Sequence, residues 1–261
     1  MLILVYASVG FSDEVKLQRA VPQGILNRVF PFSFNEHSGS CFVIDIENRQ
    51  YIITARHLVP GIKDNDNVKL FLNTAWINLR VRAIFAKNEK TDIVALAGDK
   101  LVAPKMEIYI GLKGIFVGQD VYFLGFPFGL ATKFEKPSPT HIAFIKKGIL
   151  SAIDARQDSG HILYLDGHNN PGFSGGPVIY ANYNEHERLE IAGVIAGYKN
   201  QPSQVLEAVV DESTSDTSES KKKIVHYVRE NTGIVVAFSI YEIIKAIEKS
   251  PIGFPLLDEK K

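Results

Sequence analysis

The sequence predicts an all-β protein whose strands form a sandwich or a barrel. Short apolar runs of about 4–8 residues, rich in Val, Ile, Phe and Tyr, recur along the chain between polar turns. Only one segment, near the C-terminus, has the spacing of an amphipathic helix. The chain has 261 residues, 46% of them hydrophobic, which suffices for one large domain or two small ones.

The expected strands occupy most of the chain before this helix. Residues 47–50 (ENRQ) divide the first long apolar stretch into a hairpin. Many short strands with polar turns are typical of a sandwich or a barrel. The runs that predict strands are 39–57, 68–73, 77–86, 92–98, 120–126, 141–153, 161–166, 177–180, 189–198 and 233–238.

The C-terminal helix is expected at about 239–249. Ser239 and Glu242 have the spacing of a capping box, in which Ser239 accepts from the backbone of Glu242 and Glu242 reaches back. Pro251 marks the end of the helix. One buried face is predicted from the i, i+3, i+4, i+7 spacing of Ile240, Ile243, Ile244 and Ile247.

Two segments need separate interpretation. The N-terminal run MLILVY is short and follows no Lys or Arg, so it predicts a first strand rather than a signal peptide. Residues 211–223 (DESTSDTSESKKK) lack large apolar side chains and periodicity, which predicts a solvated loop between two strands. A regulatory role for this loop stays open.

The composition argues against several function classes. Lys plus Arg number 29 and Asp plus Glu number 29, so the formal net charge is zero and no nucleic-acid partner is expected. No apolar run approaches the ~20 residues of a membrane span, so no membrane partner is expected. The lone cysteine, Cys41, excludes an internal disulfide and favours a reducing, cytoplasmic location, with a secreted or periplasmic form left open. The sequence indicates no particular oligomeric state.

No metal or cofactor is expected. The chain contains no CxxC, no HExxH and no closely spaced His pair on a helix. It also lacks the phosphate-loop patterns GxGxxG and GxxxxGK[ST]. Cys41 is a conceivable nucleophile, but its surroundings, GSCFVID, are typical of a strand that enters a core, which favours a small buried residue.

The segment Asn170–Val178 (NPGFSGGPV) favours nucleophilic hydrolysis. Its glycines and prolines suit neither a helix nor a strand, and they surround Ser174. A serine nucleophile needs a base, an orienting acid and donors for the oxyanion. The backbone N–H groups of Gly172 and Ser174 can converge on one point if Gly172 adopts a conformation denied to larger residues.

His57 and Asp92 are the expected partners of Ser174. His57 follows the apolar run YIITAR, so it lies at the end of an element, where a general base can be held. Asp92 heads the run DIVALAG, where a carboxylate can orient the histidine. Each residue alone also has an ordinary interpretation, as an edge histidine or a strand-initiating aspartate. Only the combination with Ser174 indicates a hydrolase.

Three segments together resemble trypsin-like serine proteases, and they are most similar to the HtrA-type branch. ITARHLV resembles the segment around the family's catalytic histidine, TDIVALA that around its aspartate and NPGFSGGPV that around its serine. The chain order His57, Asp92, Ser174 also matches the family. Weaker similarities in SGSCFVID, DVYFLGFPFG, KKGILSA and NTGIVVAFSIYEII extend the resemblance over roughly residues 38–249.

The resemblance implies two six-stranded antiparallel β-barrels and a C-terminal helix, with the active site between the barrels. It places the N-terminal barrel at about 20–108, the C-terminal barrel at about 109–238 and the helix at about 239–249. These parts form a single peptidase domain that spans 1–261. The chain ends soon after the helix, so no PDZ domain of the HtrA kind is expected.

The resemblance also implies a role for each site residue. His57 acts as general base and then acid, Asp92 orients it, and Ser174 attacks the scissile carbonyl. The N–H groups of Gly172 and Ser174 form the oxyanion hole. The implied reaction is hydrolysis of a protein or peptide substrate by a serine endopeptidase, through an acyl-enzyme.

Two departures from the family are informative. Phe173 stands where members activated by cleavage carry an aspartate, so no new N-terminal amine should be needed. His168 lies at the expected base of the primary specificity pocket, where cutters after Lys or Arg carry Asp. Either His168 makes this pocket polar, or it bonds to its own loop and leaves a small apolar pocket shaped by Ala196 and Gly197.

Two other functions stay open at this point. The domain could be an inactive, protein-binding relative in which Phe173 holds the oxyanion loop collapsed. A hydrolase that uses Cys41 would instead require a free histidine beside that thiol.

Overall fold

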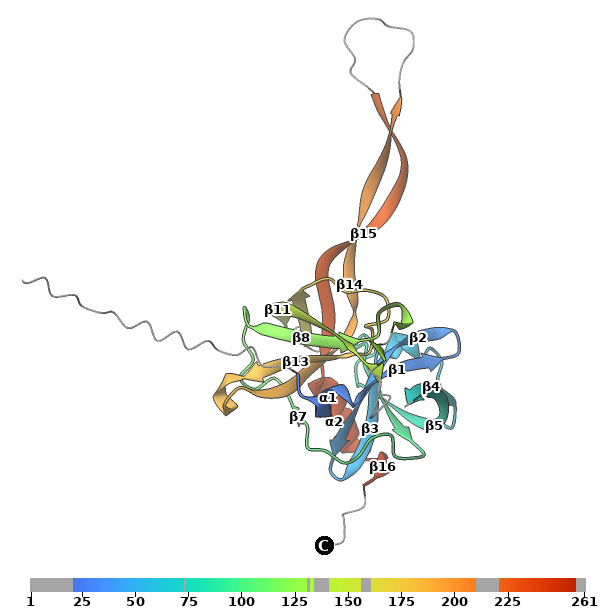
Figure 1. Cartoon of the computed structure of the whole chain (residues 1–261), viewed down its shortest axis with the longest axis vertical. Helices are drawn as coiled ribbons and strands as arrows, with labels where there is room; N and C mark the ends of the chain where they lie inside the picture. Colours follow the sequence, from blue (N-terminus) through green and yellow to red (C-terminus); the bar gives the residue numbers. More distant parts are fainter. Residues whose placement is uncertain are drawn as a thin grey trace, which may run out of the picture.

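The first of two barrels closes six antiparallel strands. The computed structural model describes residues 21–72, 74–130, 132–133, 141–155, 161–209 and 221–256. The strand order is β3-β2-β1-β4-β5-β6, pairing of β3 with β6 closes the ring, and β16 adds to β3 outside it (Figure 1). The strands are β1 Val29–Phe34, β2 His37–Ile46, β3 Arg49–Thr54, β4 Asn67–Leu72, β5 Ala75–Phe85, β6 Val94–Gly98 and β16 Phe254–Pro255.

The second barrel closes in the same way. Its order is β13-β8-β11-β12-β15-β14, pairing of β13 with β14 completes the ring, and β7 adds to β14 in parallel. The two rings confirm the predicted fold of two six-stranded antiparallel barrels. The strands are β7 Tyr109–Ile110, β8 Asp120–Gly125, β11 Phe144–Asp154, β12 Ile162–Asp166, β13 Pro177–Asn182, β14 Arg188–Val209 and β15 Lys221–Ser239, with a separate pair β9 Thr132–Lys133 and β10 His141–Ile142.

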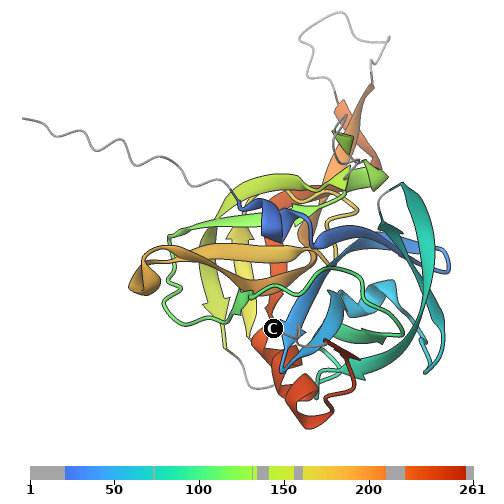
Figure 2. The same ribbon diagram turned by 60° about the horizontal axis from the view of Figure 1, so that its bottom comes forward.

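Helices are few and short, as the sequence predicts. The helix α2 follows the last barrel strand directly and lies against the base of the molecule (Figure 2). Its buried side chains Ile243 and Ile247 join the core between the barrels, as expected from their spacing. The helical elements are α1 Gln23–Leu26, α2 Tyr241–Lys249 and the 3₁₀ turns η1 Arg56–Leu58, η2 Pro127–Gly129 and η3 Tyr183–Glu185.

The start of α2 differs from the predicted capping box. Ser239 Oγ accepts from the backbone N–H of Tyr241 at 3.2 Å, not from Glu242. Glu242 Oε1 lies 3.4 Å from Nδ1 of His161 and does not reach back. The prediction fails because Ser239 is still paired in the β14–β15 ladder, while Ile240 is already helical at φ −59° and ψ −25°.

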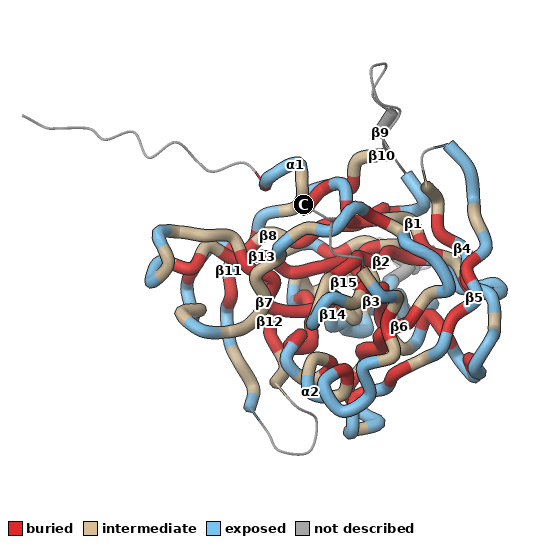
Figure 3. The backbone as a smooth tube through the Cα atoms, turned by 90° about the horizontal axis from the view of Figure 1, so that it is seen from below, coloured by how far each residue is buried: buried red, intermediate tan, exposed pale blue. Residues whose placement is uncertain are grey.

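Three apolar clusters hold the barrels together. The buried residues that form them lie along the inner strands of both barrels (Figure 3). One cluster fills each barrel, and the third lies between the barrels, where α1 and α2 also contribute. Strand β2 serves two of these clusters, because successive side chains of a strand point to opposite faces. Cys41 and Val43 lie inside the first barrel, and Phe42 and Ile44 lie between the barrels.

The hairpin between β2 and β3 confirms that the chain turns within 47–50, but the predicted turn is too long, because Arg49 and Gln50 already pair in β3. Glu47 and Asn48 form its two-residue loop, with φ of +47° and +56°. Positive φ at both central residues is the geometry that fits the right-handed twist of the flanking strands.

A long two-stranded ribbon extends β14 and β15 away from the second barrel (Figure 1). The pairing continues from Asn200 with Asn231 to Val209 with Lys221. The loop predicted at 211–223 is therefore too long, because residues 221–223 belong to β15. Residues 211–220 and the expected N-terminal strand MLILVY lie outside the described residues.

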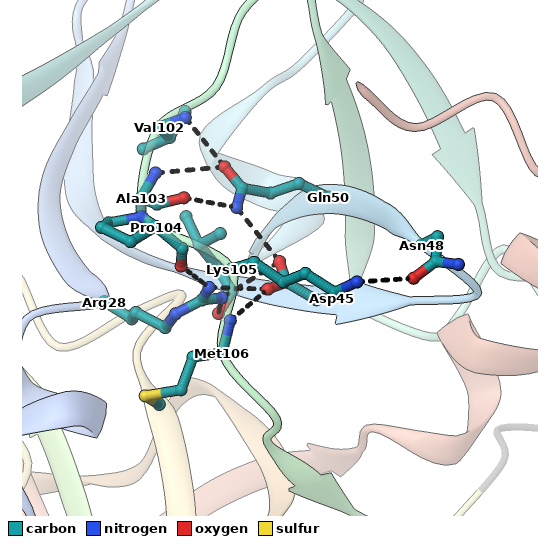
Figure 4. Close-up of polar contacts among 10 residues, drawn as sticks. Arg28, Asp45, Asn48, Gln50, Val102, Ala103, Pro104, Lys105 and Met106 are labelled. Carbon is teal, nitrogen blue, oxygen red and sulfur yellow. Dashed lines mark hydrogen bonds and ion pairs between the residues drawn. The ribbon is translucent and has the colours of Figure 1, made fainter. Parts of the chain in front are cut away.

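The segment between the barrels is fixed by a buried polar network (Figure 4). Arg28 Nη2 lies 2.7 Å from Asp45 Oδ2 and also donates to the Pro104 carbonyl. The Asp45 carboxylate further accepts from the Met106 N–H at 2.9 Å and from the Gln50 side-chain amide at 3.0 Å. The side chains of Arg28 and Asp45 are only 4% and 8% exposed, so this pair has little contact with water.

Replacing Asp45 by Ala should destabilise the fold strongly. The substitution leaves the Arg28 guanidinium buried without its partner, which typically costs about 3–5 kcal/mol. Urea unfolding at neutral pH measures the change in the free energy of unfolding. The control is Asp120→Ala, which breaks an ion pair of half-exposed side chains to Lys147 and should cost less than about 1 kcal/mol. Equal losses in the two variants would contradict the proposed role of the network.

Candidate active site

His57 and Asp92 form a close pair at one end of the first barrel. His57 lies in the 3₁₀ turn η1, directly after β3, and Asp92 precedes β6, the strand that pairs with β3. One carboxylate oxygen accepts from the His57 backbone N–H at 2.8 Å, and the other lies 2.6 Å from Nδ1. A carboxylate can only accept, so Nδ1 carries a proton, and in the neutral imidazole Nε2 is then the nitrogen that can accept one. The structure thus brings together two of the three residues predicted for the triad.

Ser174 lies where the two barrels meet. Its carbonyl accepts from the backbone N–H of Ser40 in β2 at 2.8 Å, and its Oγ is 3.4 Å from the carbonyl of Ala196 in β14. Gly39 lies between Leu58, the neighbour of His57, and the Ser174 carbonyl. Among the described residues no hydrogen bond joins Ser174 Oγ to His57. The serine hydroxyl points to β14, while the backbone of its loop approaches the residue before η1, since a Cβ at Gly175 would lie 3.1 Å from Ala55 N.

Two backbone N–H groups of the predicted oxyanion hole are unoccupied by the protein. Within the described chain, neither Gly172 N–H nor Ser174 N–H donates to an acceptor. The Pro171 carbonyl instead accepts from Phe128 N–H at 2.8 Å. Since C=O and N–H of a trans peptide point in opposite directions, this bond turns the Gly172 N–H away from Phe128.

Only glycine fits at position 172. Its φ is +105°, a conformation that residues with side chains rarely adopt. A Cβ there would also lie 2.3 Å from the Phe126 carbonyl oxygen. The backbone of the serine loop therefore packs directly against the turn after β8, which only a glycine at position 172 permits.

Ser40 fixes the serine loop from β2, and the sequence analysis did not identify it. Its fully buried hydroxyl accepts from Phe126 N–H at 3.0 Å and donates to the Gly172 carbonyl at 2.7 Å. The hydroxyl thus joins β8 of the second barrel to the peptide next to the oxyanion hole. The only signal in the sequence is a small polar residue at the head of an apolar strand, which is too common to be decisive.

Phe173 anchors the serine loop in the core of the second barrel. Its side chain is fully buried and packs edge-on against Phe123, with ring centroids 5.3 Å apart. The ammonium of Lys146 lies 5.3 Å from the centre of the Phe173 ring. Apolar burial thus holds the residue that precedes the serine, and no charged partner is needed for it.

The predicted specificity residues lie around one loop and one strand. His168 is exposed, and within the described part of its loop its ring makes no hydrogen bond. Lys146 donates to the His168 carbonyl and to the Asn170 side chain, and burial lowers its pKa. A Cβ at Gly197 would meet open space, and Ala196 lies beside Ser174, so this part of β14 is open next to the serine. The Lys146 cation beside this loop was not predicted.

Cys41 does not form a second nucleophilic site. The side chain is fully buried inside the first barrel, and burial raises the pKa of its thiol. A thiol without solvent access cannot reach a substrate, so the hydrolase that uses Cys41 is contradicted.

The described residues contain no group of three or more His, Cys, Asp or Glu side chains that could hold a metal ion. In the same part of the chain, no helix is long and apolar enough to cross a membrane.

A family model described as a trypsin-like peptidase domain matches residues 39–185, which is more than half of the chain. The matched region includes His57, Asp92 and Ser174. No curated protein matches the chain.

Several solved proteases share the fold. The HtrA-type protease AlgW with a tripeptide is 18% identical, with a TM-score of 0.56 over 88% of this chain. A serine endoprotease from Yersinia pestis is 18% identical, with a TM-score of 0.53 over 87% of this chain. This chain spans 61% and 63% of those two proteins. The inactive form of the Rv3671c protease is 16% identical, with a TM-score of 0.51 over 86% of this chain and 89% of its own.

Replacing Ser40 by Ala should slow the reaction of Ser174 with a fluorophosphonate probe about 10–100-fold. Removing one oxyanion donor typically costs about 10²–10³, and a loop that has lost one of its supports should lose part of that. The initial labelling rate, measured well below the melting temperature, tests this. Ser151→Ala, on the exposed face of β11, is the control and should label at the wild-type rate. Unchanged labelling of Ser40→Ala would show that the hydroxyl does not position the loop.

Proposed function

Because the chain belongs to the trypsin-like peptidase family, we propose that it is a serine endopeptidase that cleaves protein or peptide substrates. The observation that carries this proposal is the His57–Asp92 pair beside a serine loop with two unoccupied backbone donors. A structure of AlgW that contains a tripeptide supports a peptide as the class of ligand for this fold.

In the proposed reaction, Ser174 Oγ attacks the scissile carbonyl. His57 Nε2 takes the serine proton and later gives it to the leaving amine. Asp92 keeps the other ring nitrogen protonated and stabilises the imidazolium that forms. The His57 side chain is 44% exposed, so solvent and a substrate can reach the ring.

The negative charge that develops on the carbonyl oxygen needs hydrogen-bond donors that are already in place. The N–H groups of Gly172 and Ser174 would supply them, while Phe128 and Ser40 hold the flanking carbonyls away. Donors fixed before the reaction require no reorganisation, which is the main source of their effect. Collapse of the tetrahedral intermediate then gives the acyl-enzyme, and water releases the product.

The second candidate is an inactive, protein-binding relative. The 3.4 Å contact of Ser174 Oγ with the Ala196 carbonyl, in place of a bond to His57, favours it. Hydrogen bonds between catalytic groups are often long or misaligned without substrate, and a serine side chain has three staggered rotamers, so this one orientation of Oγ does not decide between the candidates. The reactivity of Ser174 therefore separates the two candidates.

The wild-type chain should react with a fluorophosphonate at Ser174 and cleave a mixed peptide library. Ser174→Ala or His57→Ala should lower the rate by about 10⁶, and Asp92→Asn by about 10⁴, because the amide favours the wrong histidine tautomer. Mass spectrometry locates the label and the cut sites. A folded wild-type chain that neither labels nor cleaves would favour the binding module.

Peptides with Gln, Asn, Glu or Asp before the scissile bond should be cleaved faster than those with Lys or Arg. The Lys146 ammonium disfavours a second cation at this loop, and the exposed ring of His168 can hydrogen-bond a polar side chain there. A hydrogen bond to a charged group contributes about 1.5–3 kcal/mol, and a Glu side chain can accept one from Lys146 whereas a Lys side chain cannot, so we expect a ratio of roughly tenfold in kcat/KM between Glu and Lys peptides.

The variants His168→Ala and Lys146→Met test which group sets this preference. Lys147→Met is the matched control, since that ammonium pairs with Asp120 at 2.8 Å and lies away from the loop. A wild-type profile dominated by Val, Ala or Leu, unchanged in His168→Ala, would instead support the small apolar pocket at Ala196 and Gly197.

A further inference from the structure

A pocket of about 290 Å³ lies beside the oxyanion loop, at the junction of the two barrels. Its walls come from the β1 and β2 strands, the β4–β5 hairpin, the turn η2 and the serine loop, and none comes from β14. Gly172, which supplies one of the proposed oxyanion donors, is part of the wall. The pocket therefore shares the Gly172 backbone with the site where the substrate carbonyl would be held, and the two adjoin across that residue.

The pocket is apolar and its rim is aromatic. Trp76 and Phe128 contribute to it although they are 49% and 66% exposed, and Phe71 packs edge-on against Trp76 at 5.5 Å. The described residues that line the pocket include no charged side chain. Exposed aromatic side chains around a hollow are typical of a binding site, because they lose unfavourable contact with water when a ligand covers them.

The position of Ser174 decides which half of the substrate reaches this pocket. Its side chain borders Ala196 in β14, and its carbonyl borders Ser40 in β2. In the proposed function the acyl half of the substrate lies over Ala196 and Gly197. The half that leaves must then cross to the other side of the serine, where Ser38 and Gly39 of β2 form the pocket wall.

The distance from the scissile bond limits which substrate residue can enter the pocket. An extended chain advances about 3.3 Å per residue, so only the first two residues after the scissile bond lie near Gly172. The volume is slightly below the usual lower limit of about 300 Å³ for small-molecule pockets, which suits a single side chain.

We propose that this pocket binds an aromatic or large aliphatic side chain at one of the first two positions after the scissile bond. The inference rests on the proposed peptidase activity and adds a second specificity determinant to it. Selectivity would then come from both sides of the cut, with a polar or small residue before it and a large apolar residue after it.

The test uses internally quenched peptides that differ only in the two residues after the cut found in the library experiment. Phe, Tyr, Trp or Leu at the preferred position should raise kcat/KM about 10–100-fold over Ala, because burial of one large apolar side chain has an effect of this order. Fluorophosphonate labelling of Ser174 is measured in parallel, since the probe has no residues after a scissile bond.

Trp76→Ala should lower the Phe-to-Ala ratio toward one, with its fold checked by thermal unfolding. Phe116→Ala is the matched control, because Phe116 is equally exposed at 50% but packs against Tyr183, away from the pocket. This control should keep the wild-type ratio.

Three outcomes would overturn the pocket assignment, and they differ in what they say about the peptidase activity. Labelling and cleavage with no preference after the cut would overturn the pocket assignment and leave the peptidase activity standing. A preference that Trp76→Ala leaves unchanged would also overturn the assignment. The absence of both labelling and cleavage would overturn the proposed activity together with this inference.

Discussion

The two-sided burial of β2 is the constraint on which the rest of the structure depends. Cys41 and Val43 fill the first barrel from one face of the strand, while Phe42 and Ile44 fill the core between the barrels from the other. Each fully buried side chain of this size contributes about 1.5–3 kcal/mol, and a shift of one residue would exchange the two sets. The register of β2 is therefore strongly fixed. This register also fixes the positions of its first buried residues, Gly39 and Ser40, against the serine loop.

The geometry of the candidate active site follows from this placement. The backbone N–H of Ser40 holds the Ser174 carbonyl and its hydroxyl holds the Gly172 carbonyl, so one residue of the first barrel orders the nucleophile loop of the second. Phe173 secures the same loop from the opposite side by apolar burial. In relatives activated by cleavage, an ion pair to a new N-terminus provides this support. Here hydrogen bonds and packing within the described chain provide it, so the donors can be ordered before any substrate binds.

The sequence predicted the parts of the fold that have a strong local pattern, and it missed those that depend on distant partners. The hairpin at Glu47 and the buried face of α2 follow from turn and helix periodicity. Strand β1 was missed because Pro31 interrupts its apolar pattern, and it forms only by pairing with β2 and β4. The β14–β15 ribbon was missed because it also depends on pairing between two segments of the chain rather than on a local pattern. At the site, the motifs indicated His57, Asp92 and Ser174, whereas Ser40 and Lys146 act through contacts that no spacing reveals.

Phe128 connects the oxyanion loop to the pocket beside it. Its backbone is left-handed, with φ of 52° and ψ of 25°, a conformation that costs a bulky residue on the order of 1–3 kcal/mol. In that conformation its N–H reaches the Pro171 carbonyl, while its ring stays mostly exposed at the rim of the pocket. A side chain bound in the pocket would cover this ring and so favour the strained backbone. Because the same backbone orients the Gly172 N–H, binding after the cut would also stabilise the donor that acts at the cut. Such binding energy would act on kcat as well as on KM, since it supports the transition state through the oxyanion hole.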